Sequence, residues 1–286
     1  MDNKSIRKHP IRALMFGYLT LWIHSKRTLL MLLVLLAMAY ITTYSYGNSL
    51  MFYGYTMHLE ESLVWFLKSG FNSMGFASLT FLVAVSEIPR RIPLHQYCIL
   101  RTSRNKWMLS LIGYCFLMVI TTVCAITICA TIFLIPYTTL GSGWSDTLRV
   151  QNGMVEELAY IPAWLRNHYQ PWQAILLSLW PIVLFWTVMV LSILFFSLLG
   201  YPAIGVSVYG VILFSGLIFV FENFPKFQPP MTFSTLGRIV TGYENTFQQR
   251  MLTVFLGYLG CILCQVLALI LVAQRAEIPT YSIAKA

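Results

Sequence analysis

The residues of this chain that could do chemistry are few and widely separated. One pair of potential ligands is Cys261-x-x-Cys264, a spacing that redox and zinc sites use. Both cysteines lie inside a long apolar run, where small packing residues are the ordinary interpretation. The adjacent acids Glu156 and Glu157 could indicate a membrane protease, but they lie in a polar segment between apolar runs. Neither pair therefore predicts a catalytic or metal site.

The other catalytic residue types are equally scattered. His24, His95 and His168 lie in three separate segments, so they do not form the polar cluster that a lipid-modifying intramembrane enzyme would need. The chain contains neither the phosphate-binding motif G-x-x-x-x-G-K-[ST] nor the zinc motif H-E-x-x-H. We therefore expect a chain that is not an enzyme and that binds no cofactor or metal of its own.

The elements that position these residues follow from composition. The chain is 58% hydrophobic and only 10% charged, whereas soluble domains carry about 25% charged residues. Its apolar runs are continuous and do not alternate, so they predict helices, which satisfy the backbone in lipid. At about 20 residues per span, we expect an all-α, multi-pass protein of the cell membrane with six transmembrane helices, at 28–46, 63–85, 107–135, 172–199, 203–221 and 251–272.

The distribution of charge predicts the orientation. Most of the 19 Lys and Arg residues lie in the N-terminal segment, in the loop between spans two and three, and in the C-terminal tail, while seven of the ten acids lie in the other loops. Basic residues mark the cytoplasmic side. Both termini are therefore expected in the cytoplasm. The parts of this single domain, residues 1–286, are then an N-terminal helix (1–27), the six-helix bundle (28–272), a cytoplasmic loop (86–106) and a tail (273–286).

An amphipathic helix precedes the first span. Helical spacing gathers its apolar residues on one face, namely Ile11, Leu14, Met15, Tyr18, Leu19 and Trp22. We expect this helix to lie in the cytoplasmic membrane interface, anchored by Arg12, Trp22, Lys26 and Arg27. The alternative is that the first span simply begins early, and the charges of Lys26 and Arg27 argue against it.

The loop at 86–106 concentrates positive charge in Arg90, Arg91, Arg101, Arg104 and Lys106. Pro93 can open a short helix in which Leu94, Tyr97 and Arg101 share one face, and Ser103 can cap the third span. Such a helix suits docking into a groove of another protein. The other interpretation is topology together with contacts to lipid phosphates. The residues alone leave both interpretations open.

The stretch IPLHQYCILRTSRNKWMLS, with its spacing of Tyr97, Arg101, Ser103, Arg104 and Trp107, resembles the loop between spans two and three in ABC exporter permeases. These are six-helix membrane subunits whose ATPases are separate chains. The resemblance implies a coupling helix from Pro93 to Arg101 that contacts an ATPase, with contact residues Pro93, Leu94, Tyr97, Arg101, Arg104 and Trp107. It also implies two ATPase partners, which bind the ATP and magnesium, and a second permease, either a copy or a paralogue. No nucleic acid is expected.

By the same resemblance, spans two and five line a translocation path. The candidate lining residues are Lys68, Asn72, Phe76 and Thr80 in span two and Ser207, Gly210 and Phe214 in span five. Lys68 is the only charge within a span, and it either lines a cavity or extends to the outer headgroups. The apolar character of the path favours an amphipathic or hydrophobic cargo, such as a peptide, a lipid-linked molecule or a drug. The alternative function is a membrane sensor or assembly scaffold that transports nothing.

Overall fold

The structure is a computed structural model that describes residues 10–68, 75–86, 88, 103–145, 161, 163–221 and 244–275. Every regular element among them is a helix: α2 (Pro10–Ile23), α3 (Lys26–Tyr53), α4 (Leu59–Lys68), α5 (Phe76–Val85), α7 (Arg104–Leu134), η2 (Ile135–Tyr137), α10 (Ala163–His168), α11 (Pro171–Leu198), α12 (Pro202–Phe221) and α14 (Glu244–Arg275). A single isolated bridge pairs His58 with Thr139 in the described part. The expected all-helical class is confirmed.

Within the described residues, four helical segments are long and apolar enough to cross a membrane: Lys26–Tyr53, Arg104–Tyr137, Pro171–Leu198 and Leu252–Gln274. They coincide with the first, third, fourth and sixth predicted spans. The fifth predicted span corresponds to α12. The range of the second, 63–85, covers the later part of α4 and all of α5, and residues 69–74 between these helices lie outside the described part. Several helices of the length and apolar character that a multi-pass membrane protein requires are therefore confirmed, while six membrane spans stay a prediction.

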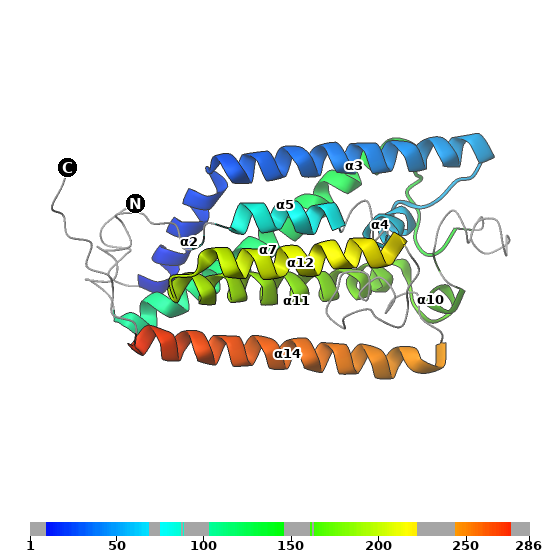
Figure 1. Ribbon diagram of the computed structural model, residues 1–286. Coiled ribbons are helices and arrows are strands. Elements are labelled where there is room, and N and C mark those ends of the chain that lie inside the picture. Colours follow the sequence, from blue (N-terminus) through cyan, green and yellow to red (C-terminus); the bar gives the residue numbers. More distant parts are fainter. Residues whose placement is uncertain are drawn as a thin grey trace.

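The long helices run side by side, and α11 lies among them as the central element (Figure 1). It packs against α14, α12, α7, α4 and α5. Its Trp186 is completely buried, stacks on Phe81 of α5 with ring centroids 4.7 Å apart, and donates its indole N–H to Ser78 Oγ at 2.8 Å. These contacts fix α5 to the centre of the bundle.

Helices α2 and α3 are separate, as the charges of Lys26 and Arg27 predicted. Ser25 has an extended backbone (φ −77°, ψ 144°), and its hydroxyl accepts the N–H of Thr28 at 3.0 Å. Serine is favoured at the N-cap position because its side-chain oxygen accepts a hydrogen bond from one of the free N–H groups at a helix start. The axis of α2 consequently turns away from that of α3 at one end of the bundle (Figure 1).

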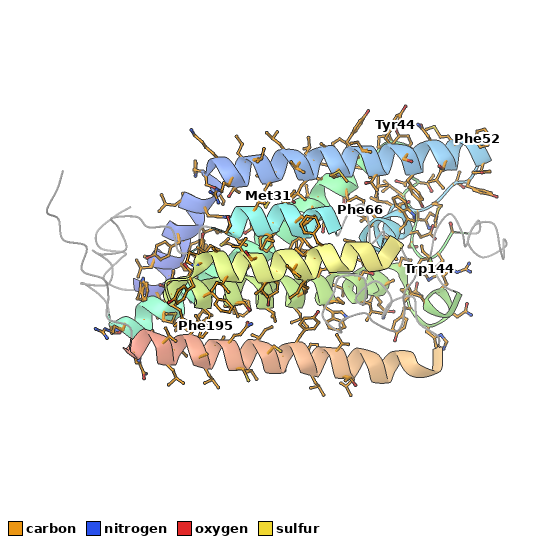
Figure 2. The ribbon with its side chains drawn as sticks, in the orientation of Figure 1. Met31, Tyr44, Phe52, Phe66, Trp144 and Phe195 are labelled. Atoms are coloured by element: carbon orange, nitrogen blue, oxygen red, sulfur yellow. The ribbon has the colours of Figure 1, made fainter. Side chains whose placement is uncertain are left out.

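Helix α3 is longer than the predicted first span. It continues past Tyr46 to Tyr53, a total of 28 residues, or about 42 Å. The polar residues Ser45, Asn48 and Ser49 lower the hydropathy here without breaking the helix. Gly54 ends it with φ +67°, a left-handed conformation that glycine adopts without steric cost. The last turn carries Phe52, which is 84% exposed (Figure 2).

Candidate functional site

One end of the bundle, called the α2 end here, brings together α2, the starts of α3 and α7, and the ends of α5 and α14 (Figure 1). The predicted apolar face of α2 packs on α7. Its Tyr18 and Trp22 are buried, and the rings of Tyr18 and Tyr114 lie 5.7 Å apart. The polar residues Arg12, Thr20 and His24 are exposed. The division of α2 into two faces is confirmed, and the partner of the apolar face is a protein helix.

Two of the predicted membrane anchors hold the end of α5. The indole N–H of Trp22 donates to the carbonyl of Ala84 at 3.3 Å, and the guanidinium of Arg27 donates to Ser86 Oγ at 2.6 Å. Ser86 in turn donates to the carbonyl of Val83 at 2.8 Å. Carbonyls at a helix C-terminus lack partners within the helix and carry partial negative charge. Trp22 and Arg27 therefore stabilise this end of α5. A membrane-anchoring role for them, and for the exposed Arg12 and Lys26, stays a prediction.

The start of α7 is tied to the end of α14. Arg104 donates to the carbonyl of Gln274, one residue before the end of α14, at 3.1 Å. Trp107, in the next turn, is half-buried. Ser103 occupies the predicted N-cap position with an extended backbone, but its hydroxyl makes no capping hydrogen bond. Helix α7 therefore begins directly after Ser103, as that residue predicted, but the side-chain cap is not formed.

The remaining predicted coupling residues, Pro93, Leu94, Tyr97 and Arg101, lie outside the described residues. The structure does describe both flanks of their segment. On one side, Ile88 is buried and donates its N–H to the carbonyl of Val85 at 3.1 Å. On the other side, the chain resumes at Ser103 and enters α7. The segment between these flanks is thus attached at both ends to fixed elements of the α2 end.

Five of the candidate path residues lie on α5 and α12, two helices that contact each other, whereas Lys68 is the last residue of α4. Thr80 of α5 is half-buried, and its hydroxyl donates to the carbonyl of Ala77 at 3.0 Å. On α12, Ser207 and Phe214 are exposed, and a Cβ at Gly210 would meet nothing within 4 Å. Asn72 lies outside the described part of the chain, as do the side chains of Lys68 and Phe76.

The opposite end of the bundle, the α4 end, carries a polar cluster that sequence reasoning missed. The carboxylate of Glu61 is completely buried and accepts hydrogen bonds from the N–H of Ser145, from Ser145 Oγ at 2.8 Å and from the N–H of His58 at 3.0 Å. His58 Nδ1 lies 2.8 Å from the carbonyl oxygen of Gly143. We call His58, Glu61, Gly141, Gly143 and Ser145 the Glu61 cluster.

Burial determines the acidity of Glu61, which precedes the predicted second span. Removal of the carboxylate from water raises its pKa above the usual value, and this effect outweighs the hydrogen bonds from Ser145 and His58 and the nearby imidazole, which act in the opposite direction. In the sequence, Glu61 appeared only as an acid that marks one side of the membrane. Its partner Ser145 lies 84 residues away, so no local pattern could have identified the pair.

Close packing completes the α4 end. A Cβ at Gly141 would collide with the imidazole of His58. Trp144 is buried and donates its indole N–H to the carbonyl of Tyr169 at 2.7 Å (Figure 2). Tyr46 of α3 stacks on Trp65 of α4 with centroids 3.9 Å apart. These contacts join α3, α4 and the segments on either side of residues 146–160.

The cysteines form no site in the described part of the chain. Cys261 is half-buried, Cys264 is exposed, and neither is in a disulfide. No group of three or more His, Cys, Asp and Glu side chains comes together among the described residues. The described residues thus form two features. At the α2 end, hydrogen bonds join helix ends to one another, and at the α4 end the Glu61 cluster is buried.

No family model, no curated protein and no solved structure matches this chain.

Proposed function

We propose that the chain is the permease subunit of an ATP-driven ABC exporter. It has six spans with both termini in the cytoplasm, and it forms the translocation path as a dimer with a copy or a paralogue. Two separate ATPase subunits bind its cytoplasmic loop and supply ATP and magnesium. The proposal rests on two points. The stretch IPLHQYCILRTSRNKWMLS, with its spacing of Tyr97, Arg101, Ser103, Arg104 and Trp107, resembles the loop between spans two and three of these permeases. The contacts at the α2 end are the second point.

The observation that carries the proposal is the attachment of the basic segment 89–102 to the bundle. One flank continues α5, whose end is held by Trp22 and Arg27, and the other begins α7, whose Arg104 holds the end of α14. A displacement of this segment by a partner would act on α5 and α7 directly. It would act on α3 and α14 through Arg27 and Arg104. A coupling element needs such a rigid connection, because packed helices transmit displacement as rigid bodies.

The charges support the orientation. Arg12, Lys26, Arg27, Arg104 and Lys106 belong to elements that meet at the α2 end, whereas Glu60 and Glu61 belong to the α4 end. The excess of basic residues favours the cytoplasm for the α2 end. This is the side on which a cytoplasmic ATPase would bind.

The apolar character of the helices supports the cargo class. The described helices of the predicted path, α5 and α12, contain no Asp, Glu, Lys or Arg. A charged cargo would lose its hydration there without gaining a counter-ion. An amphipathic or hydrophobic cargo therefore fits these helices best.

The test is affinity purification of the tagged chain in mild detergent, followed by identification of bound proteins and assay of ATP hydrolysis. We expect a stoichiometric ATPase that Arg101→Glu or Tyr97→Ala releases. Arg12→Glu is the matched charge reversal on the exposed side of α2, and it should retain the ATPase. A chain that purifies alone from several detergents, without ATP hydrolysis, would contradict the permease function and favour the sensor or scaffold.

A further inference from the structure

The contact between α11 and α14 contains polar atoms that have no hydrogen-bond partner. Trp180 Nε1 and Thr187 Oγ1 of α11, and Tyr258 Oη and Gln265 Oε1 of α14, are buried and unpaired among the described residues. Thr187 and Tyr258 are only 1% exposed. A polar group that is removed from water and left unpaired is costly in free energy, especially inside a membrane. Four such atoms on two adjacent helices therefore call for a partner.

We call this contact between α11 and α14 the seam, and a ring contact and a hydrogen bond place Trp180 and Gln265 in it. The ring of Trp180 packs edge-on against Phe255 of α14, with centroids 5.6 Å apart. Thr187 follows two turns later on the same face of α11, because seven residues make about two helical turns. Tyr258 and Gln265 are likewise two turns apart on α14. Gln265 donates its amide N–H to Ser192 Oγ of α11 at 2.6 Å, which closes the far end of the seam.

Thr187 differs from four other helical threonines of this chain in its hydrogen bonding. Thr43, Thr122, Thr127 and Thr131 all donate to the carbonyl four residues earlier, at 2.7–2.9 Å. This is the usual bond of a threonine inside a helix. Thr187 makes no such bond. Its hydroxyl is consequently available to a group that enters the seam.

The chemistry of the seam selects a neutral ligand. It offers an N–H donor from Trp180, a carbonyl acceptor from Gln265 and two hydroxyls, which can donate or accept. Ser192 also lies 2.9 Å from Tyr209 Oη, so the hydrogen-bonded groups continue to α12. Neither α11 nor residues 252–274 contain an acid, a lysine or an arginine. A charged ligand would therefore find no counter-ion.

We propose that this seam binds an uncharged amphipathic molecule. Its hydroxyl or amide head pairs with Thr187, Tyr258 and Gln265, and its apolar body lies between α11 and α14. The unpaired atoms are closed off in the present structure, so α14 must separate from α11 to admit the head group. Of the four span-length helices, α14 is the least buried. The bound molecule is a cargo only if the permease function holds, but the binding itself belongs to this chain alone.

The test is equilibrium binding of radiolabelled oleamide to the chain in phosphatidylcholine nanodiscs. Thr187→Val and Tyr258→Phe remove one hydroxyl each and keep the shape of the side chain. Each should weaken oleamide binding about fivefold, the worth of one neutral hydrogen bond. Each should also raise the melting temperature of the ligand-free chain, because an unpaired buried hydroxyl is lost. Oleyl sulfate, which has the same chain and a fixed charge, should bind at least about tenfold more weakly than oleamide.

Two substitutions serve as matched controls. Thr127→Val removes a hydroxyl that is bonded within α7, and Tyr44→Phe removes an exposed hydroxyl from α3. Neither should change oleamide binding. The proposal is overturned if oleamide does not bind the wild-type chain, or if Thr187→Val and Tyr258→Phe bind it as the wild type does.

The source of the natural ligand is a separate outcome. A neutral lipid that co-purifies with the wild-type chain and is lost from Tyr258→Phe would identify the bilayer as the source. If no neutral lipid co-purifies with the wild-type chain and the chain still binds added oleamide, the natural ligand comes from outside the bilayer. Both results support the site. Because no ATPase takes part, failure of the permease proposal would leave the result standing.

Discussion

Glu61 connects two segments that are far apart in the chain. Its carboxyl group is exposed to water only when the chain is unfolded. In the fold it is completely buried among donors from His58 and Ser145. A buried carboxylate is stable only when its hydrogen bonds are satisfied or when it takes up a proton. The Glu61 cluster therefore combines a mechanical role at the α4 end with a dependence on pH.

The stability of the chain should depend on pH through Glu61. Its pKa is raised in the folded state above the ordinary 4.5, so the folded chain binds this proton more tightly than the unfolded chain. The resulting contribution to the free energy of unfolding is complete below pH 4.5 and is lost as the pH rises through the folded pKa. The melting temperature should therefore contain a component that falls from pH 4.5 towards neutrality, measurable by thermal unfolding in detergent.

Glu61→Gln should remove this component, because glutamine does not titrate. Glu60→Gln is the matched control, since it removes the same charge from the neighbouring, only half-buried position. It should leave the slope unchanged. Equal slopes in the wild-type chain and Glu61→Gln would show that the cluster does not titrate in this range.

Gly141 should not tolerate a side chain. Gly141→Ala would force the imidazole of His58 away from the carbonyl of Gly143, because a Cβ collides with the ring. Overpacking of this kind typically costs about 1–3 kcal/mol, which should appear as a lower melting temperature. Gly257→Ala, on an exposed turn of α14 where a Cβ meets nothing within 4 Å, provides the comparison. It should be neutral or slightly stabilising, and an equal loss in both variants would contradict the close packing at Gly141.

Among the elements, those specified by local pattern could be predicted from the sequence. Continuous apolar runs identified the four span-length helices, and the charges of Lys26 and Arg27 identified the break before α3. Contacts between distant residues could not be predicted in this way. Trp22 was expected at the membrane surface, but its indole bonds to Ala84, 62 residues away. Arg104 was expected to contact a partner protein, and within the chain it bonds to Gln274, 170 residues away.

The cap of α3 is the local feature that most directly separates it from α2. Ser25→Ala should cost about 1 kcal/mol of stability, the usual worth of an N-cap hydroxyl, because the N–H of Thr28 loses its partner. The melting temperature measures this loss. Ser49→Ala removes an exposed serine hydroxyl from the other end of α3, where it bonds only to the carbonyl of Ser45, and should have little effect. Equal melting temperatures for the wild-type chain and Ser25→Ala would contradict a stabilising cap.

At the scale of the molecule, the two ends of the bundle differ in charge and in construction. At the α2 end, Arg27 donates to the hydroxyl of Ser86 at the end of α5 and Arg104 donates to the carbonyl of Gln274 at the end of α14, whereas the α4 end buries Glu61. This difference agrees with the charge asymmetry from which the orientation was predicted. The number of spans was harder to fix from sequence, because hydropathy defines a range such as 63–85 without showing whether one helix fills it. The structure describes α4 and α5 within that range.

The orientation can be tested with single cysteines. Leu140→Cys lies at the α4 end, where Leu140 is 90% exposed, and Asn105→Cys lies at the exposed start of α7. A membrane-impermeant maleimide should label Leu140→Cys in intact cells, but Asn105→Cys only after the cells are opened. The background should be a chain in which the native cysteines are replaced. The reverse pattern would place the α2 end outside the cell and contradict a cytoplasmic coupling loop.

The most direct measurement of the central claim is the mass of the intact complex released from the membrane, determined by native mass spectrometry. The permease function predicts two membrane subunits, either two copies of this chain or this chain with a paralogue, together with two ATPase chains. The complex should take up ATP and magnesium on the ATPase chains alone. A mass that corresponds to this chain by itself, or to its oligomer without any ATPase, would contradict the account.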